Sequence, residues 1–189
     1  MTRLSTCSLL LAGLLATAST VAIAAPRTVT DPQAPRALQD DGPVSVGWND
    51  PRTFTELRSS RNRSEAERGN WVQQLAEYIR TAATKRLQPG QALDVTLVDI
   101  KRAGDFEPWH GARGDDIRIM RDIYPPRIVL QYTLKGAGGE VIAEQEATLR
   151  DTGFMHGSIG LHGSSDPLRY EKKLIDDWLR DLGKDVAAR

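Results

Sequence analysis

The fold is decided by the stretch Arg127-Ile-Val-Leu-Gln-Tyr-Thr-Leu-Lys-Gly-Ala-Gly-Gly-Glu-Val-Ile-Ala-Glu-Gln-Glu-Ala-Thr-Leu-Arg150. On both sides of its glycine-rich centre, apolar and polar residues alternate, which is the period of a strand with one buried face. The alternating apolar residues are Ile128, Leu130, Tyr132 and Leu134, then Val141, Ala143, Ala147 and Leu149. Gly136 to Gly139 supply the backbone freedom for a tight reversal. The stretch therefore predicts two antiparallel strands, over 127–135 and 140–150.

The same alternation occurs twice upstream. It runs through Val44-Ser45-Val46-Gly47-Trp48, where Asn49-Asp50-Pro51 then stops the strand. It returns over residues 92–101, with Leu93, Val95 and Leu97 on one face, directly after the Pro89-Gly90 turn signal. These segments predict two further strands, so the sheet has four.

Two amphipathic helices are predicted between and after the strands. The first opens with a capping box, Ser64-Glu65-Ala66-Glu67, in which Ser64 and Glu67 each satisfy a free backbone donor of the other. The second opens with Asp166 as N-cap and Pro167 in its first turn, and Gly183 is its expected stop. Each helix has one apolar face at helical spacing. These faces comprise Trp71, Leu75, Tyr78, Ile79 and Ala82 in the first, and Tyr170, Leu174, Ile175, Trp178 and Leu182 in the second.

The order of elements predicts an α+β fold in two layers, a mixed four-stranded sheet with two helices on one face. Each helix offers a single apolar stripe, so each covers the sheet from one side. The strand–helix–strand opening favours a right-handed crossover, which makes the first two strands parallel. The remaining pairings are antiparallel.

The N-terminus has the pattern of a removable export signal. Arg3 provides the positive start, an apolar run follows over 9–18, and Ala22-Ile23-Ala24 is a small-x-small cleavage site. The alternative, a membrane anchor, is disfavoured because the apolar run is short for a membrane span. We therefore expect a signal peptide over 1–24 cleaved after Ala24, a flexible linker over 25–43, and a single domain over 44–185 in the periplasm.

Composition limits the partners of the chain. Its 25 basic and 25 acidic residues balance, so there is no general attraction to nucleic acid or to an anionic membrane. The single cysteine, Cys7, leaves with the signal, so the exported domain is expected to fold without a disulfide. No second apolar span follows, hence the cleaved chain is not expected to span the membrane. We expect no cofactor.

Chain direction places three long connections at one end of the predicted sheet. They cover residues 49–63, 102–126 and 151–165, and long loops in compact domains are often functional. Polar and aromatic side chains concentrate there. The candidate ligand-binding residues are Asp105, Glu107, Trp109, Asp116, Arg118 and Arg121. All three histidines also fall in these loops, and they define an alternative metal site: His110, His156 and His162.

Each candidate has a functional and a structural interpretation. Arg118 and Arg121 either grip an anion or neutralise the neighbouring acids Asp115, Asp116 and Asp122. Asp105 and Glu107 are too close in sequence for the facing walls of an acid–base pair, and a turn and an arginine partner are the simpler prediction. Ser158 lacks the strand-to-helix turn of a nucleophile elbow. Trp109 is either a binding anchor or packs under its own loop.

Three segments of the chain resemble a known family. They are residues 87–108, beginning Leu87-Gln-Pro-Gly, residues 116–127, beginning Asp116-Ile-Arg-Ile-Met, and residues 166–178, beginning Asp166-Pro-Leu-Arg-Tyr. Together they resemble the exported proteobacterial proteins catalogued as domain of unknown function 3016, over most of residues 44–182. The resemblance implies a Gram-negative envelope location and supplies no activity.

The sequence favours a periplasmic, non-catalytic binding module. An envelope protein or a small ligand would dock on the loops at one end of the sheet. The alternative is a metal-dependent hydrolase that uses the histidines and aspartates of the same loops.

Overall fold

A mixed four-stranded sheet forms one layer of the computed structural model, which describes residues 28–110, 115–156 and 165–187. Its strand order is β1 (Val44–Trp48), β2 (Ala92–Lys101), β5 (Arg127–Lys135), β6 (Val141–Arg150). β1 is parallel to β2, and the other two pairings are antiparallel. The predicted α+β fold and its mixed sheet are confirmed.

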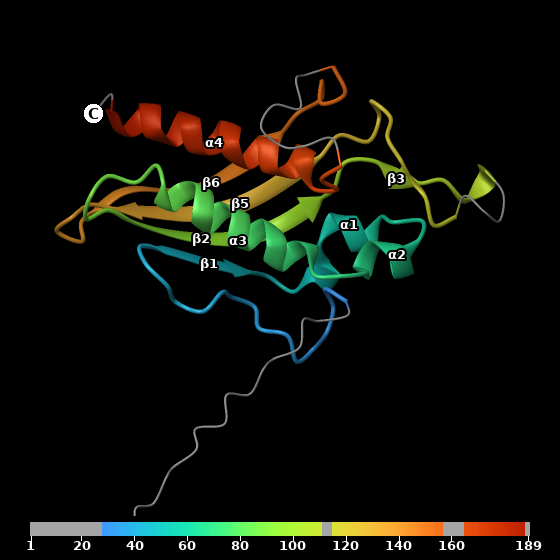
Figure 1. Cartoon of the computed structure of the whole chain (residues 1–189), viewed down its shortest axis with the longest axis horizontal. Coiled ribbons are helices and arrows are strands. Elements are labelled where there is room, and N and C mark those ends of the chain that lie inside the picture. The colour runs from blue at the N-terminus through green and yellow to red at the C-terminus, as the bar shows by residue number, and fades with distance from the viewer. Residues whose placement is uncertain (1–27, 111–114, 157–164, 188–189) are drawn as a thin grey trace, which may run out of the picture.

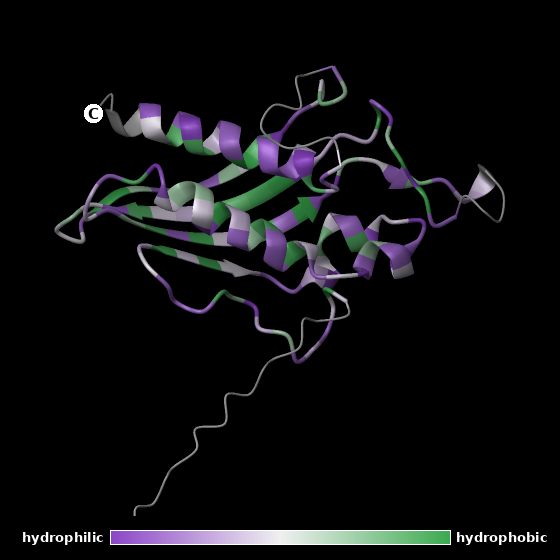
Figure 2. Cartoon of the chain, viewed as in Figure 1, coloured by the Kyte–Doolittle hydropathy of each residue, from purple (hydrophilic) through white to green (hydrophobic). Residues whose placement is uncertain are grey.

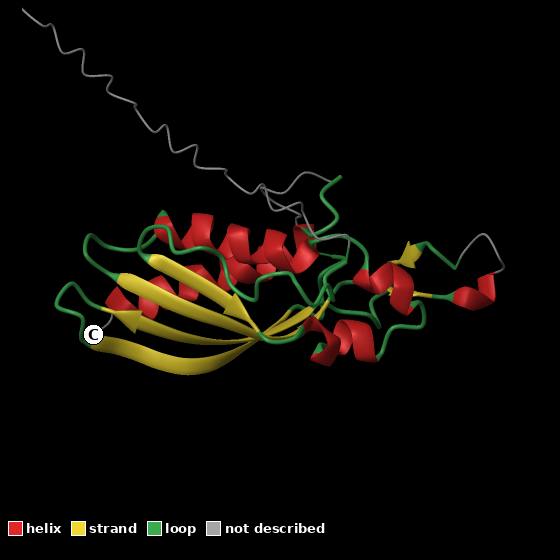
Figure 3. Cartoon of the chain, turned by 90° about the horizontal axis from the view of Figure 1, so that it is seen from below, coloured by secondary structure: helices red, strands yellow, loops and turns green. Residues whose placement is uncertain are grey.

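Two helices form the second layer, α3 (Trp71–Thr84) and α4 (Arg169–Ala187). Both lie on the same face of the sheet (Figures 1 and 3). Their apolar faces and the inward side chains of the strands make one core. In Figure 2, green hydrophobic residues recur along the strands and along both helices. The ring of Trp178 packs edge-on against Tyr132 of β5, with centroids 5.5 Å apart.

The predicted start of the first long helix is wrong. Residues 63–67 form a separate short helix, α2 (Arg63–Glu67), and Gly69 breaks the chain with a φ of +84° before α3 begins at Trp71. The side chain of Asn62, rather than Ser64, caps α2 by accepting the N–H of Glu65. Glu67 does not complete a capping box, because its carboxylate accepts the hydroxyl of Thr30 at 2.5 Å.

The last helix also differs at both ends. Asp166 does accept a backbone N–H, that of Leu168 at 2.8 Å, but regular helix begins three residues later at Arg169. Gly183 does not stop the helix, which continues to Ala187. A lone glycine costs a helix only about 1 kcal/mol relative to alanine, so it does not end a helix that is otherwise well formed.

Residues 28–38, expected to belong to a flexible linker, pack against the domain. Val29 is buried in the core, and Thr28 forms a β-bridge with Arg68. Leu38 donates its N–H to Val46, so this segment covers the open edge of β1. The polar composition misled the prediction because two well-placed apolar side chains suffice to anchor a short segment. The expected signal peptide lies outside the described residues.

Two short elements connect β1 to α2, namely η1 (Pro51–Thr53) and α1 (Thr55–Arg58). Among the described residues, none of the helices is long and apolar enough to cross a bilayer.

Candidate functional site

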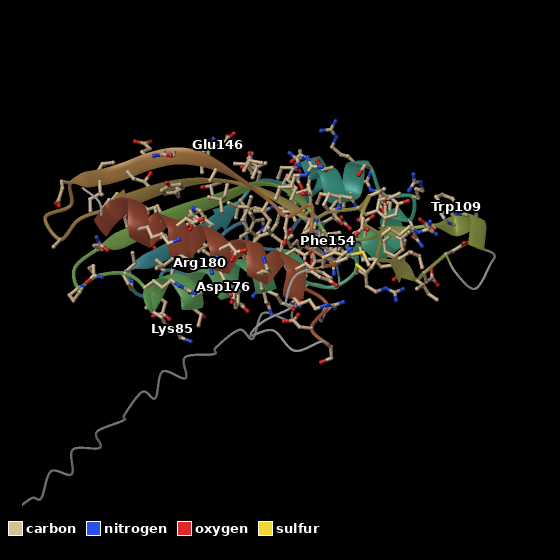
Figure 4. The ribbon with its side chains drawn as sticks, turned by 90° about the horizontal axis from the view of Figure 1, so that it is seen from above. Lys85, Trp109, Glu146, Phe154, Asp176 and Arg180 are labelled. Atoms are coloured by element: carbon tan, nitrogen blue, oxygen red, sulfur yellow. The ribbon has the colours of Figure 1, made fainter. Side chains whose placement is uncertain are left out.

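The connection from β2 to β5 is a projecting hairpin rather than an open loop. Within the described residues 102–110 and 115–126, hereafter the arm, β3 (Asp105–Phe106) pairs antiparallel with β4 (Arg118–Ile119). A 3-10 turn, η2 (Pro108–His110), follows β3. The arm extends beyond the end of the sheet, beside α1 and α2 (Figure 1), and Trp109 lies at its far end (Figure 4).

The base of the arm is fixed by a buried carboxylate on α1. Glu56 is fully buried and accepts from the guanidinium of Arg118, from Nζ of Lys101 at 3.2 Å and from the N–H of Arg102 at 3.0 Å. Burial alone raises the pKa of the Glu56 carboxyl, but the cations of Arg118, Lys101 and Arg102 together lower it below its ordinary value. The carboxylate therefore stays charged and holds the arm to the domain.

Arg118 also contacts the arm itself. Its guanidinium donates to the carbonyl oxygens of Ala103 and Gly104, at 3.3 and 3.1 Å, and lies 4.7 Å from the centre of the Phe106 ring. Only 12% of the side chain is exposed. The pairing predicted with the neighbouring aspartates is thus replaced by a pairing with Glu56. Arg118 therefore links α1 to both carbonyl groups at the start of the arm.

A second buried carboxylate supports the middle of the arm. Glu107 is almost fully buried and accepts from Arg121 Nη2 at 2.7 Å and from the Tyr124 hydroxyl at 2.9 Å. This confirms the arginine partner predicted for Glu107. Asp105 is also buried, with Arg61 Nη1 at 3.5 Å and Lys101 Nζ at 3.9 Å. Both carboxylates are thus paired with cations of the protein.

Gly104 allows the tight turn that launches the arm. Its φ is +76°, a conformation that residues with a side chain rarely adopt. A Cβ at this position would lie 2.7 Å from the carbonyl oxygen of Ile119 and 2.9 Å from the sulfur of Met120. The backbone of the returning strand therefore approaches Gly104 as closely as a glycine permits.

A third buried carboxylate joins the arm to α4. Glu171 accepts the N–H of Ala103 at 2.7 Å through Oε1, whereas Oε2 is buried without a hydrogen-bond partner. Burial raises the pKa of the Glu171 carboxyl above its ordinary value, although Arg102 and the Ala103 N–H oppose this. Ala103 also packs against Phe154 and Tyr170, so a small second core lies beneath the arm.

The outer part of the arm is apolar and exposed. Trp109 is 60% exposed, with the Arg61 guanidinium 5.0 Å from its ring centre. Ile117 is 55% exposed, and Ile123 is exposed as well. Nearby, Asn62 donates to the carbonyl of Asp115 at 2.9 Å and to the carboxylate of Asp116 at 3.2 Å. Trp109 therefore does not pack under its loop, and Asp116 serves to bind the arm to the turn before α2.

The three long connections do meet at one end of the domain. The first contacts the arm through Glu56, Arg61 and Asn62, and the third contacts it through His156, whose Nδ1 is 3.8 Å from Asp122. His156 is largely exposed. The side chain of His110, and all of Ser158 and His162, lie outside the described residues. Among the side chains that are described, no group of three His, Cys, Asp or Glu is close enough to hold a metal ion.

Sequence reasoning missed the residues that hold the arm in place, namely Glu56, Lys101, Arg102 and Glu171. One signal was available for Glu171, which stands on the same helical stripe as Ile175, Trp178 and Leu182. A carboxylate on an apolar stripe becomes buried when the helix packs, so it needs a hydrogen-bonding or charged partner. No comparable signal marks Glu56, because its α1 helix has only four residues and no apolar period.

Comparison with known proteins gives one family match. Neither the curated proteins nor the solved structures that were compared match this chain. A family model, described as protein of unknown function (DUF3016), matches residues 42–181, which include the sheet, α3, the arm and the first part of α4. The chain therefore belongs to this family of proteins of unknown function.

Proposed function

We propose that this protein is an exported, non-catalytic binding module of the cell envelope, and that the arm is its binding surface. Export is supported by the signal pattern that ends at Ala24. An intact mass of the protein recovered from the periplasm tests it, because cleavage removes residues 1–24. A mass that still includes Cys7 contradicts the proposal.

One observation supports the arm as the binding surface. Of the five large hydrophobic side chains that are exposed within the described ranges, three stand on the arm, at Trp109, Ile117 and Ile123. A fourth, Met155, is on the connection beside it, and only Val141 lies elsewhere. Exposed apolar side chains concentrated on one feature are typical of an interaction surface.

The support beneath these side chains favours binding. Glu56, Glu107 and Glu171 tie the arm to α1, to its own return strand and to α4, respectively, so its base is fixed before any partner arrives. A preorganised surface loses less conformational entropy when it binds. Tryptophan and arginine are also among the residues that most often contribute the largest share of binding energy in an interface.

The same contacts disfavour catalysis. Asp105 and Glu107 are buried and held by Arg61 and Arg121. A general acid or base needs a free position next to a substrate. The arm instead presents indole and aliphatic groups outward.

A matched pair of variants tests the proposal. Ile117→Ser and Val141→Ser each remove one aliphatic side chain of nearly equal exposure, 55% and 56%, the first on the arm and the second on β6. The tagged protein is purified from native envelopes, and the proteins and lipids that accompany it are quantified. We expect Ile117→Ser combined with Trp109→Ser to reduce the specific companions at least tenfold, and Val141→Ser to leave them unchanged. Equal losses, or no loss in the arm variant, overturn the proposal.

A further inference from the structure

Within residues 52–68, which lie beside the arm, the acidic side chains are at least half-buried and the arginines are exposed. Five arginines lie within residues 52–68, and every one is exposed: Arg52, Arg58, Arg61, Arg63 and Arg68. We call this set the arginine face. The acids of the same stretch are buried or half-buried, at Glu56, Glu65 and Glu67. The balanced net charge of the chain therefore conceals a local excess of exposed positive charge.

The arm adds little negative charge to this surface. Its exposed charged residues, counted over the described part of the arm, are Arg121, Asp116 and Asp122. Four of the five arginines have a carboxylate partner: Arg52 pairs with Asp50 at 3.9 Å, Arg61 with Asp105 at 3.5 Å, Arg63 with Glu67 at 3.5 Å and Arg68 with Glu65 at 2.6 Å. A guanidinium has five N–H donors, so such a pairing leaves other donors for an external anion.

The negative side chains of the sheet lie on another surface. Glu144 and Glu146 of β6 and Asp94 of β2 are on the face that the helices leave uncovered. In Figure 4, Glu146 is over the sheet and far from Trp109. Glu146 therefore adds no negative charge beside the arginine face, and Asp94 is paired with Lys135 at 2.7 Å.

We infer that the arm and the arginine face dock on an anionic lipid bilayer, with the guanidinium groups on headgroup phosphates and Trp109 in the interface. The inference rests on the proposed function and names the partner. Tryptophan prefers the bilayer interface, where its ring is apolar and its N–H is hydrated. Clusters of four or more arginines bind anionic lipid surfaces, and apolar side chains beside them add affinity. A projecting arm can reach such a surface without a shape-matched pocket.

A bilayer suits this surface better than an acidic protein. The five arginines are distributed over η1, α1, α2 and the turns between them. A lipid surface supplies phosphates wherever a guanidinium lies, whereas a protein partner has to place each carboxylate in a matching position. If the arm binds an acidic protein instead, its variants lose protein partners while anionic vesicles leave the Trp109 emission unchanged.

Trp109 provides the signal for the test. The other three tryptophans, Trp48, Trp71 and Trp178, are buried in the core, and the structure describes all four. Iodide quenching of the purified protein therefore reports mainly on Trp109. We expect vesicles of phosphatidylcholine with phosphatidylglycerol to shift the emission to the blue and to reduce iodide quenching severalfold. Pure phosphatidylcholine vesicles should have a much smaller effect, and added salt should reverse the change.

Two charge-reversal variants form a matched pair. The first variant combines Arg58→Glu and Arg63→Glu. Arg58 is exposed, and Arg63 forms an ion pair with Glu67. Lys85→Glu with Arg180→Glu makes the same kind of change elsewhere, because Lys85 is exposed and Arg180 pairs with Asp177 on the helix surface. Both control residues lie far from Trp109 (Figure 4). We expect the first variant to weaken vesicle binding at least tenfold and the second less than twofold.

The outcomes separate this inference from the proposed function. Unchanged Trp109 emission with anionic vesicles, or equal losses in the two charge variants, overturns lipid docking. Suppose lipid docking fails but the Trp109→Ser and Ile117→Ser variant still co-purifies with fewer native partners. The arm then remains the binding surface, and its partner is a protein. If neither vesicles nor companions depend on the arm, both proposals fail.

Discussion

Replacing Arg118 by methionine should destabilise the domain by about 3 kcal/mol. The substitution keeps the apolar stem over Phe106 but removes the cation nearest to Glu56, which is fully buried. Breaking one partner of a buried ion pair costs about 3–5 kcal/mol. We expect the lower end because Lys101 still lies 3.2 Å from the same carboxylate. For a domain of this size, the midpoint of thermal unfolding should fall by about 6–12 °C.

Urea unfolding, followed by circular dichroism, measures this change. Arg63→Met is the matched control, because Arg63 is exposed and its partner Glu67 is only half-buried, and it should cost at most about 1 kcal/mol. The difference between Arg118→Met and the parent should shrink as the pH falls through the lowered pKa of Glu56, since a protonated carboxyl needs no counter-charge. Equal stability of Arg118→Met and Arg63→Met at pH 7 would refute the reasoning.

Three other substitutions test separate parts of the structure. Gly104→Ala should destabilise the arm by more than about 1 kcal/mol, because the new Cβ meets backbone at a positive φ, and hydrogen exchange of the arm amides would show the loss. Trp178→Ala should cost about 3–5 kcal/mol in urea, and a loss below about 1 kcal/mol would mean that α4 is not packed as described. The parent should lose stability as the pH rises from 4.5, the ordinary carboxyl value, through the raised pKa of folded Glu171. Glu171→Gln should abolish this pH dependence. The folded carboxyl binds its proton more tightly than the unfolded one, so stability is greater on the acid side, and identical pH profiles would contradict the burial argument.

The sheet could be predicted from sequence because its signal is local. Alternation in residues 127–150 gives the strand period and most of the buried face, and the glycine turn between the halves gives the antiparallel pairing. Val141 is the exception, because the register shifts next to it and leaves its side chain 56% exposed. The break before α3 could not be predicted in the same way. Ser64 and Glu67 fit a capping box, and only the tertiary contact between Glu67 and Thr30 shows why that box does not form.

The candidate site was predictable in position but not in detail. Loop length and chain direction brought the three connections to one end, and Glu107 has the arginine partner expected for it. The roles of Arg118 and Arg121 depend on which buried carboxylate each meets. Glu56 is 62 residues away from Arg118 in sequence, so no local pattern connects them. Long-range ion pairs of this kind follow from the assembled fold.

Site-specific photo-crosslinking in living cells tests the central claim, that the arm is the binding surface, most directly. A photoreactive phenylalanine analogue replaces Trp109 at the tip of the arm or, as control, Val141 on β6, which has similar exposure. The account predicts adducts of lipid or protein at position 109 that are several times more abundant than those at position 141. Equal adducts at the two positions, or adducts at position 141 alone, would contradict it.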